Sequence, residues 1–204
     1  MANGSARGAL NSLAQCLLRM TVPGLPDLYQ GNEFWDFSLV DPDNRRPVDF
    51  GARQQALQPP VTPTELIDDW RSGRIKQALI ARTLAVRAQH TELFRRGDYQ
   101  PLQVCGEHAA NVLAFSRRKA TQQAIVVIPR LAQGLLGEAQ GLLGENGRPW
   151  VAPAAWGDTR IKLPLDTPLG KLKGLFYAGA VTPHEELMVG DALGDFPVNL
   201  FIQI

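Results

Sequence analysis

The spacing of apolar residues changes from a helical to an alternating pattern near residue 98. Within residues 5–20 the apolar positions fall on one stripe at helical spacing, which predicts an amphipathic helix that packs on a core. The members of this stripe are Leu10, Leu13, Ala14, Leu17 and Leu18. A polar, proline-containing connection is expected later, at residues 51–61.

Residues 62–96 predict two further helices. Thr62 and Glu65 have the spacing of a capping box and Pro63 takes the favoured first helical position, so a short helix begins there and ends near Gly73. A second helix is predicted over residues 74–96, where one face carries Ile75, Leu79, Val86, His90 and Leu93.

From residue 98 onwards, short runs with period two are separated by Gly, Pro, Asn and Asp, which is typical of an all-β module. Strands are expected at residues 102–105, 112–116, 124–128, 160–163, 172–177, 186–189 and 197–202. Short strands of this kind suit an antiparallel sandwich. Arg117, Arg118 and Lys119 are expected at a solvated strand end. The predicted domains are therefore residues 1–97 and 98–204.

A tandem duplication, QGLLGEA followed by QGLLGEN, interrupts this module at residues 133–146. Two copies are too few for a repeat fold. We interpret the duplication as a loop extension, because lengthening a surface loop costs little. The alternative is a partner contact through Leu135, Leu136, Leu142 and Leu143. Nearby, Trp150 and Trp156 could offer a sugar-stacking surface or be buried under the extended loop.

The composition of the chain argues against nucleic-acid and membrane partners. The chain has 204 residues, 45% of them hydrophobic, with 21 basic against 20 acidic residues. This balance gives no reason to expect a nucleic-acid or membrane partner. Cys16 and Cys105 form neither a metal-binding spacing nor a disulfide framework. His90 and His184 have no partner pattern, and His108 is expected in a hairpin turn, so all three are read as structural or solvated. We expect a cytoplasmic protein that uses no metal and no cofactor.

Residues 23–50 have the profile of a sugar-binding loop. This stretch contains no long apolar run and gathers Tyr29, Gln30, Glu33, Trp35, Asp36, Asp41, Asp43, Asn44, Arg45, Arg46 and Asp49. Sugar hydroxyls bind carboxylates, amides and guanidinium groups, while sugar rings stack on aromatic side chains.

The same stretch predicts a short strand that leads into this loop. Pro23 and Gly24 stop the preceding helix, and Leu28 and Tyr29 are expected in the middle of a short buried strand. Glu33 and Trp35 would follow that strand directly. In a (β/α) barrel, residues at this end of a strand lie on the catalytic face.

These residues carry a family resemblance. Gly24, Pro26, Tyr29, Gly31 and Glu33 follow the pattern G-x-P-x-x-Y-x-G-x-E, which resembles a motif shared widely across the α-amylase superfamily. The second half, SLVDPDNRRPVDF at residues 38–50, resembles the eighth-strand region of one trehalose-forming branch, the maltooligosyl trehalose synthases. The resemblance covers the chain from about residue 10 and weakens after residue 101.

The resemblance implies an α+β fragment: the last strand and helices of a (β/α)8 barrel, followed by an antiparallel β-sandwich. A complete barrel needs roughly 250 residues, so the sequence is expected to be the C-terminal part of a larger enzyme, without a closed barrel of its own. Residues 25–31 would then be covered by the flanking helices or by another molecule.

The activity that the resemblance implies is an intramolecular glucosyl transfer. The reducing-end α-1,4 bond of a maltooligosaccharide is converted to an α,α-1,1 bond through a covalent intermediate, which uses a carboxylate nucleophile and a carboxylic acid/base. The family's catalytic carboxylates lie on earlier strands, and no motif in this sequence matches them. No catalytic residue is therefore assigned, and the chain alone is expected to be inactive. Its implied partners are the maltooligosaccharide and the missing N-terminal barrel portion.

We assign eight residues to the substrate subsite as hypotheses: Glu33, Asp41, Asp43, Asn44, Arg45 and Arg46 as its wall, and Tyr29 and Trp35 as packing or stacking surfaces. Several of them have a structural alternative. Asp43 and Asn44 also suit a turn, because their side chains bond their own backbone. Arg45 and Arg46 could instead pair with Asp41 and Asp49, and Tyr29 could belong to the core.

Three functions stay open at this point. The first is the C-terminal part of a maltooligosyl trehalose synthase. The second is a part of another α-amylase-superfamily hydrolase or glucanotransferase, which would differ in its products. The third is a non-catalytic β module that binds glucan, which would show measurable maltooligosaccharide affinity as an isolated chain.

Overall fold

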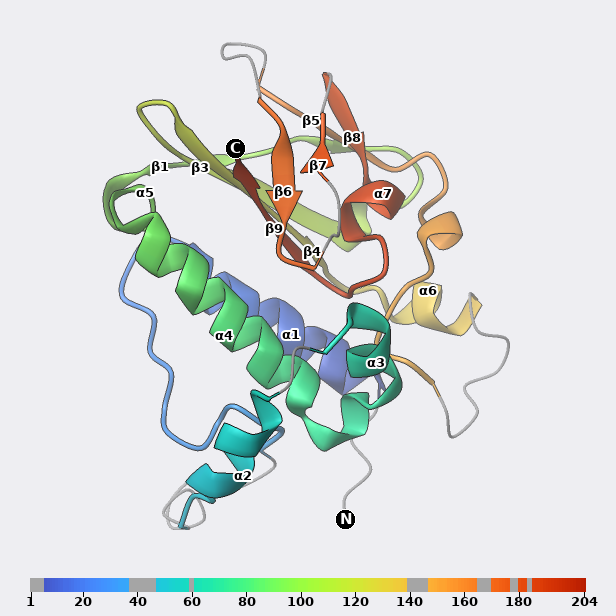
Figure 1. Ribbon diagram of the computed structural model, residues 1–204. Helices are drawn as coiled ribbons and strands as arrows, with labels where there is room; N and C mark the ends of the chain where they lie inside the picture. Colours follow the sequence, from blue (N-terminus) through green and yellow to red (C-terminus); the bar gives the residue numbers. More distant parts are fainter. Residues whose placement is uncertain are drawn as a thin grey trace.

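The computed structural model describes residues 6–36, 47–58, 61–138, 147–164, 170–176, 180–182 and 185–204. Helices come first along the chain and cover one face of an antiparallel sheet built from the second half (Figure 1). The helices of the first half are α1 (Ala6–Thr21), α2 (Phe50–Ala56), α3 (Pro63–Asp68), the 3-10 turn η2 (Trp70–Ser72), α4 (Arg74–Gln89) and α5 (Thr91–Arg96).

The second half forms two antiparallel sheets. The six-stranded sheet has the order β1 (Asp98–Pro101), β3 (Val112–Lys119), β4 (Gln122–Pro129), β9 (Asn199–Gln203), β6 (Leu172–Gly174) and β7 (Ala180–Val181). The three-stranded sheet has the order β2 (Val104–Cys105), β5 (Arg160–Lys162) and β8 (Glu186–Met188). Short helical segments connect these strands: η3 (Ala109–Asn111), α6 (Gln133–Glu138), η4 (Pro153–Trp156) and α7 (Val189–Leu193).

Strand β4 shows why this sheet is buried on both faces. Successive side chains of a strand point to opposite faces. Ala124, Val126 and Ile128 belong to a core shared with α1 and α4. Ile125 and Val127 belong to a second core, which contains β5, β8 and α7 residues. The chain is therefore a mixed α and β structure whose central sheet has helices on one face and the small sheet on the other.

Several expectations from the sequence are confirmed. Helix α1 matches the predicted first helix to within one residue at each end. The capping box of α3 is present, because the Thr62 hydroxyl accepts a hydrogen bond from the Glu65 backbone and the Glu65 carboxylate accepts one from the Thr62 backbone. Within the described ranges the sheets form no closed barrel.

Other helical expectations are wrong in detail. The predicted helix 74–96 breaks at His90, which separates α4 from α5. The stretch 51–61, expected to be a connection, contains most of α2, because Asp49 accepts a hydrogen bond from the Ala52 backbone and caps that helix. No helix in the described part of the chain has the length and apolar character that crossing a bilayer would need.

The strand expected around Leu28 and Tyr29 is not formed. Residues 25–29 have no assigned secondary structure, and residues 30–33 form a turn. Leu25 is 97% exposed and Tyr29 is 52% exposed, so the flanking helices leave this segment largely uncovered. A strand requires a neighbour to satisfy its backbone groups, and the described residues supply no neighbour here.

The first copy of the duplication belongs to the core. It forms α6, where Leu135 and Leu136 are 4% and 1% exposed, so a partner contact through these two leucines is wrong. Leu142 and Leu143, in the second copy, lie outside the described residues. Trp156 is completely buried, which rules out a stacking surface at that position. Trp150 is half-buried and donates a hydrogen bond to the Gly194 carbonyl (2.9 Å).

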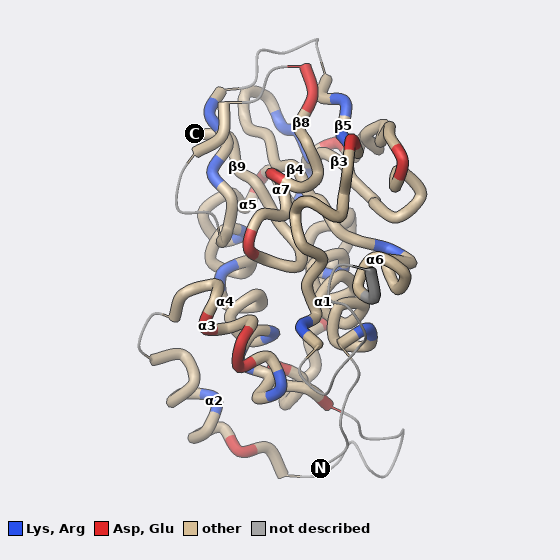
Figure 2. Tube along the Cα trace, turned by 90° about the vertical axis from the view of Figure 1, so that its right-hand side faces the viewer, with Lys and Arg blue, Asp and Glu red and all other residues tan. Residues whose placement is uncertain are grey.

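Charged residues of both signs are spread over the helical and the strand parts of the molecule (Figure 2). The numbers of basic and acidic residues are nearly equal, with a formal net charge of +1. One basic residue departs from the pattern: Arg117 was expected at a solvated strand end but is 1% exposed.

Candidate functional site

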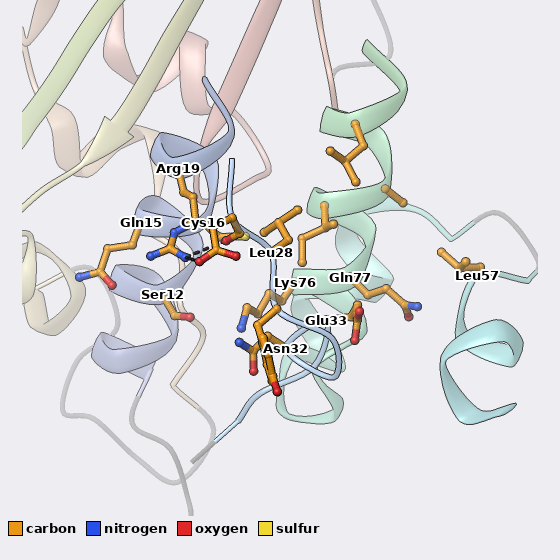
Figure 3. A pocket seen from close by; sticks show the side chains of 15 residues that line it. Ser12, Gln15, Cys16, Arg19, Leu28, Asn32, Glu33, Leu57, Lys76 and Gln77 are labelled. Atoms are coloured by element: carbon orange, nitrogen blue, oxygen red, sulfur yellow. Dashed lines mark hydrogen bonds and ion pairs between the residues drawn. The ribbon is translucent and has the colours of Figure 1, made fainter. Parts of the chain in front are cut away.

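A cleft of about 620 Å³ lies between α1 and α4, and the segment that follows α1 crosses it (Figure 3). Polar and apolar groups from four parts of the chain converge on it. Its lining includes Ser12, Gln15, Cys16 and Arg19 from α1, Asp27, Leu28, Tyr29, Asn32 and Glu33 from the segment, Lys76, Gln77, Ile80, Ala81 and Leu84 from α4, and Leu57.

The end of α1 is held by arginines. Arg117 donates a hydrogen bond to the Thr21 carbonyl (2.8 Å), and Arg87 donates one to the Met20 carbonyl. Arg19 reaches forward, donating to the Asp27 carbonyl at 2.7 Å and lying 3.8 Å from the Asp27 carboxylate. Cations near a helix C-terminus interact favourably with its unpaired carbonyls. The direction in which the chain leaves α1 is thereby fixed.

Arg53 of α2 holds the turn that contains Glu33. Its Nε lies 2.7 Å from Glu33 Oε2, and its Nη2 donates to the Gly31 carbonyl at 2.5 Å. The guanidinium also lies 4.9 Å from the centre of the Phe34 ring. Gln77 of α4 donates to the Arg53 carbonyl (2.8 Å), which ties α2 and α4 together. The Glu33 carboxylate is thus half-buried and paired with a cation.

Trp35, two residues after Glu33, is anchored by Trp70. Its Nε1 donates to the Trp70 carbonyl at 2.6 Å, and the two indole rings meet edge to face at 6.4 Å. Lys76 donates to the Phe34 carbonyl (3.2 Å) and lies 6.0 Å from the Trp35 ring. Gly73, at φ +85°, lets residues 34 and 35 come close, since a Cβ there would lie 2.9 Å from Phe34 Cβ.

Burial shifts the pKa values of two groups in the cleft. Burial raises the pKa of the Cys16 thiol, and the nearby charges of Lys76 and Arg19 only partly oppose this. Burial also lowers the pKa of Lys76, while Cys16, Asp36 and Glu33 act in the opposite direction.

The structure describes three of the eight residues assigned to the subsite. Glu33 and Tyr29 line the cleft, whereas Trp35 packs against Trp70 and is not among the lining residues. The other five lie outside the described residues: Asp41, Asp43, Asn44, Arg45 and Arg46. Asp49, considered as a partner for Arg45 or Arg46, caps α2.

Sequence reasoning missed the residues that support the turn. Arg53 lay in a stretch expected to be a connection, and Lys76 and Gln77 lay on a helix expected to be purely structural. Nothing in the sequence marked them, because the burial of Gln77 follows from packing that only the structure shows. Among the described residues no group of three or more His, Cys, Asp or Glu side chains could hold a metal ion.

The cleft is chemically suited to a polyhydroxyl ligand. Carboxylates, amides and cations lie beside apolar side chains such as Leu28 and Ile80. Its two carboxylates, Asp27 and Glu33, are each paired with an arginine. The described part of the cleft therefore offers binding groups and no free carboxylate pair for glycosidic bond cleavage.

Solved structures share this fold. An alpha-amylase from Anoxybacillus superposes with a TM-score of 0.55 at 16% sequence identity, covering 96% of this chain and 32% of that one. This chain therefore shares its fold with part of that alpha-amylase. No protein-family model matches the chain.

Two proteins with higher sequence identity to this chain are maltooligosyl trehalose synthases. The maltooligosyltrehalose synthase from Arthrobacter ramosus has a TM-score of 0.71 and 32% identity, covering 97% of this chain and 22% of that one. A putative maltooligosyl trehalose synthase from Mycobacterium tuberculosis is 35% identical over 193 residues, which is 95% of this chain and 20% of that protein. The chain is homologous to the C-terminal portion of maltooligosyl trehalose synthases, and it spans about a fifth of the length of these curated relatives.

Proposed function

We propose that this chain is the C-terminal part of an enzyme that converts the reducing-end α-1,4 bond of maltooligosaccharides to an α,α-1,1 bond by intramolecular glucosyl transfer. The observation that carries the proposal is homology to maltooligosyl trehalose synthases over 95% of the chain. In this proposal residues 1–97 complete a (β/α)8 barrel and residues 98–204 form the β-sandwich domain beside it. The parent protein works in the cytoplasm.

The catalytic carboxylates belong to the remaining, N-terminal portion of the enzyme. Two features of this chain support that division. The carboxylates of the cleft, Asp27 and Glu33, are engaged with Arg19 and Arg53. The sequence also lacks motifs for a nucleophile and an acid/base. The chain alone therefore binds and positions, and the other portion supplies the bond-breaking groups.

The N-terminal barrel portion is the partner of the exposed segment between Pro23 and Gly31. Leu25 is 97% exposed there, and Tyr29 is 52% exposed. Residues 25–29 take part in neither of the two sheets. An extended segment of this kind pairs readily with another strand. Its position between α1 and α4 suits a last barrel strand with its two neighbouring helices.

The loop from residue 29 to residue 46 forms the wall of the subsite that holds the released glucose. Glu33 and Tyr29 lead into it, and Asp41, Asp43, Asn44, Arg45 and Arg46 complete it. Such a subsite must retain one glucose and exclude water from the covalent intermediate. The anchoring of residues 31–36 by Arg53, Trp70 and Lys76 supports this role, because it fixes the described first part of the segment in one orientation.

A chimaeric enzyme tests the proposal. The matching region of the Arthrobacter ramosus enzyme is replaced by this chain, and the chimaera is incubated with maltopentaose. We expect reducing ends to disappear while the oligosaccharide keeps its length. A folded chimaera that only releases shorter reducing sugars would contradict the proposal and favour an amylase-type hydrolase.

The subsite assignment has its own test in the same chimaera. Changing Arg45 and Arg46 together to alanine should lower trehalose-forming kcat/KM by about 100-fold, because two charge-assisted hydrogen bonds are worth roughly 3 kcal/mol. Arg95→Ala, an exposed arginine on α5, serves as the control. Unchanged trehalose formation in the double variant would remove both arginines from the subsite.

A further inference from the structure

A second hollow, of about 360 Å³, lies between the C-terminal half of α4 and strands β6 and β9. It shares no lining residue with the cleft between α1 and α4. Three parts of the chain line it: Arg82, Ala85, Val86, Gln89 and His90 from α4 and its C-terminal cap, Lys173, Gly174 and Leu175 from β6 and the residue after it, and Ile202 and Ile204 from β9 and the residue following its end.

The charged side chains in the described lining of this hollow are basic. Arg82 and Lys173 line it together with His90, and the described lining contains no aspartate or glutamate. Ile204, the last residue of the sequence, adds its α-carboxylate to the lining. The elements that form it share this bias. Helix α4 carries Arg74, Lys76, Arg82 and Arg87 and no acidic residue, β6 carries Lys173, and β9 carries no charge.

Arg82 forms no ion pair with a carboxylate of the described residues, and its contacts are carbonyls and a ring. Its two Nη atoms donate to the carbonyls of Leu175 (3.1 Å) and Val61 (3.2 Å), and the guanidinium lies 4.4 Å from the centre of the Phe176 ring. Burial lowers the pKa of Arg82, which reflects partial loss of hydration. A partly dehydrated cation that meets only carbonyls and a ring gains free energy from an anion beside it.

The rest of the hollow is apolar. Val86, Leu175 and Ile202 contribute aliphatic side chains beside the cations, and Ala85 leaves room at the helix surface. The buried Nδ1 of His90 has no hydrogen-bond partner within the described ranges. A fully hydrated inorganic anion would leave this aliphatic surface uncovered, whereas a ligand with an apolar body would cover it.

We propose that the hollow between α4, β6 and β9 binds a small organic anion, with its carboxylate between Arg82 and Lys173 and its aliphatic part against Val86, Leu175 and Ile202. Such a ligand bridges the helical layer and the neighbouring strands β6 and β9 of the sheet. The site is independent of the proposed glucosyl transfer, because it shares no residue with that cleft.

Isothermal titration calorimetry of the purified chain with hexanoate tests this proposal. The same titration with 1-hexanol and with inorganic phosphate gives the comparison. We expect saturable binding of hexanoate, with affinity at least about tenfold above that of either comparison probe, which corresponds to about 1.4 kcal/mol. No saturable heat with hexanoate, or equal binding of 1-hexanol, would overturn the proposal.

Two pairs of variants locate the ligand. Lys173→Glu should weaken hexanoate binding by about tenfold, since it replaces attraction by repulsion, whereas Lys162→Glu on β5 should leave it unchanged. Ala85→Phe fills the hollow without changing charge and should abolish binding. Ala88→Phe, on the same helix but outside the hollow, is the control. Loss of binding in both members of a pair, or in neither, would place the ligand elsewhere.

Discussion

Arg117 lies on β3 with 1% of its surface exposed, and its hydrogen bonds join three separate elements. It donates to the carbonyls of Thr21 (2.8 Å), Phe94 (3.1 Å) and Gly97 (2.8 Å). Burial lowers its pKa, with Arg87 acting in the same direction and Asp98 opposing. One guanidinium therefore fastens the ends of α1 and α5 to the sheet. It also holds the end of α1, from which residues 22–36 run across the cleft.

Arg117→Met should destabilise the chain by about 3 kcal/mol, because it leaves buried carbonyls without donors. The measurement is urea unfolding followed by circular dichroism. Lys119→Met, at the exposed end of the same strand, should stay within about 0.5 kcal/mol of the unmodified chain. Equal midpoints for the two variants would show that Arg117 is not a structural clamp.

At the scale of single elements, two local features define where the helices around the candidate site begin and end. The capping box of Thr62 and Glu65 begins α3, and hydrogen bonds from Thr62 lower the pKa of the Glu65 carboxyl. Gly73 separates η2 from α4 and lies directly against residues 34 and 35. Both were predicted as helix boundaries from sequence, but the contact of Gly73 with the loop was not.

The capping box predicts a pH dependence of stability. The folded-state pKa of Glu65 is lowered, so its contribution is complete above the unfolded-state pKa of about 4.3 and disappears as the pH falls through the folded-state pKa. Glu65→Gln should therefore be less stable than the unmodified chain at pH 7. The difference should shrink as the pH is lowered below about 4. A difference that stays constant throughout acid titration would contradict this assignment.

Gly73→Ala should disturb residues 34 and 35 by direct contact. A Cβ at this positive φ would meet Phe34 Cβ and the Trp35 backbone nitrogen at 2.9 Å, so we expect a loss of about 2 kcal/mol. The fluorescence of Trp35 and Trp70 should change with it. Gly134→Ala, where a Cβ meets nothing within 4 Å, should be neutral or slightly stabilising. An unchanged fluorescence spectrum in Gly73→Ala would mean that the loop does not depend on this contact.

For the whole molecule, periodicity predicted most of the regular elements. Helices α1 and α3 and the central strands β3 and β4 have strong local patterns, and they formed close to their predicted places. Strands β1 and β7 were missed because β1 is exposed along its whole length and β7 has only two residues. The strand expected at Leu28 failed for a non-local reason, since pairing depends on a neighbour that the described residues do not contain.

The candidate site was predictable in composition but not in contacts. The polar segment after α1 was recognised, and Glu33 and Tyr29 do line the cleft. The ion pair between Glu33 and Arg53 joins residues far apart in the sequence, and nothing in their spacing indicates it. The burial of Arg117 was missed for the same reason, because its acceptors are carbonyls of distant helix ends.

The most direct test of the proposed division between binding and catalysis is one measurement of reducing ends. Maltopentaose is incubated with this chain, with an Arthrobacter ramosus enzyme truncated to remove the matching region, and with a mixture of the two. We predict that reducing ends stay constant with either part alone and fall in the mixture without shortening of the oligosaccharide. A fall with this chain alone would show that it carries catalytic groups, and it would contradict the proposed division.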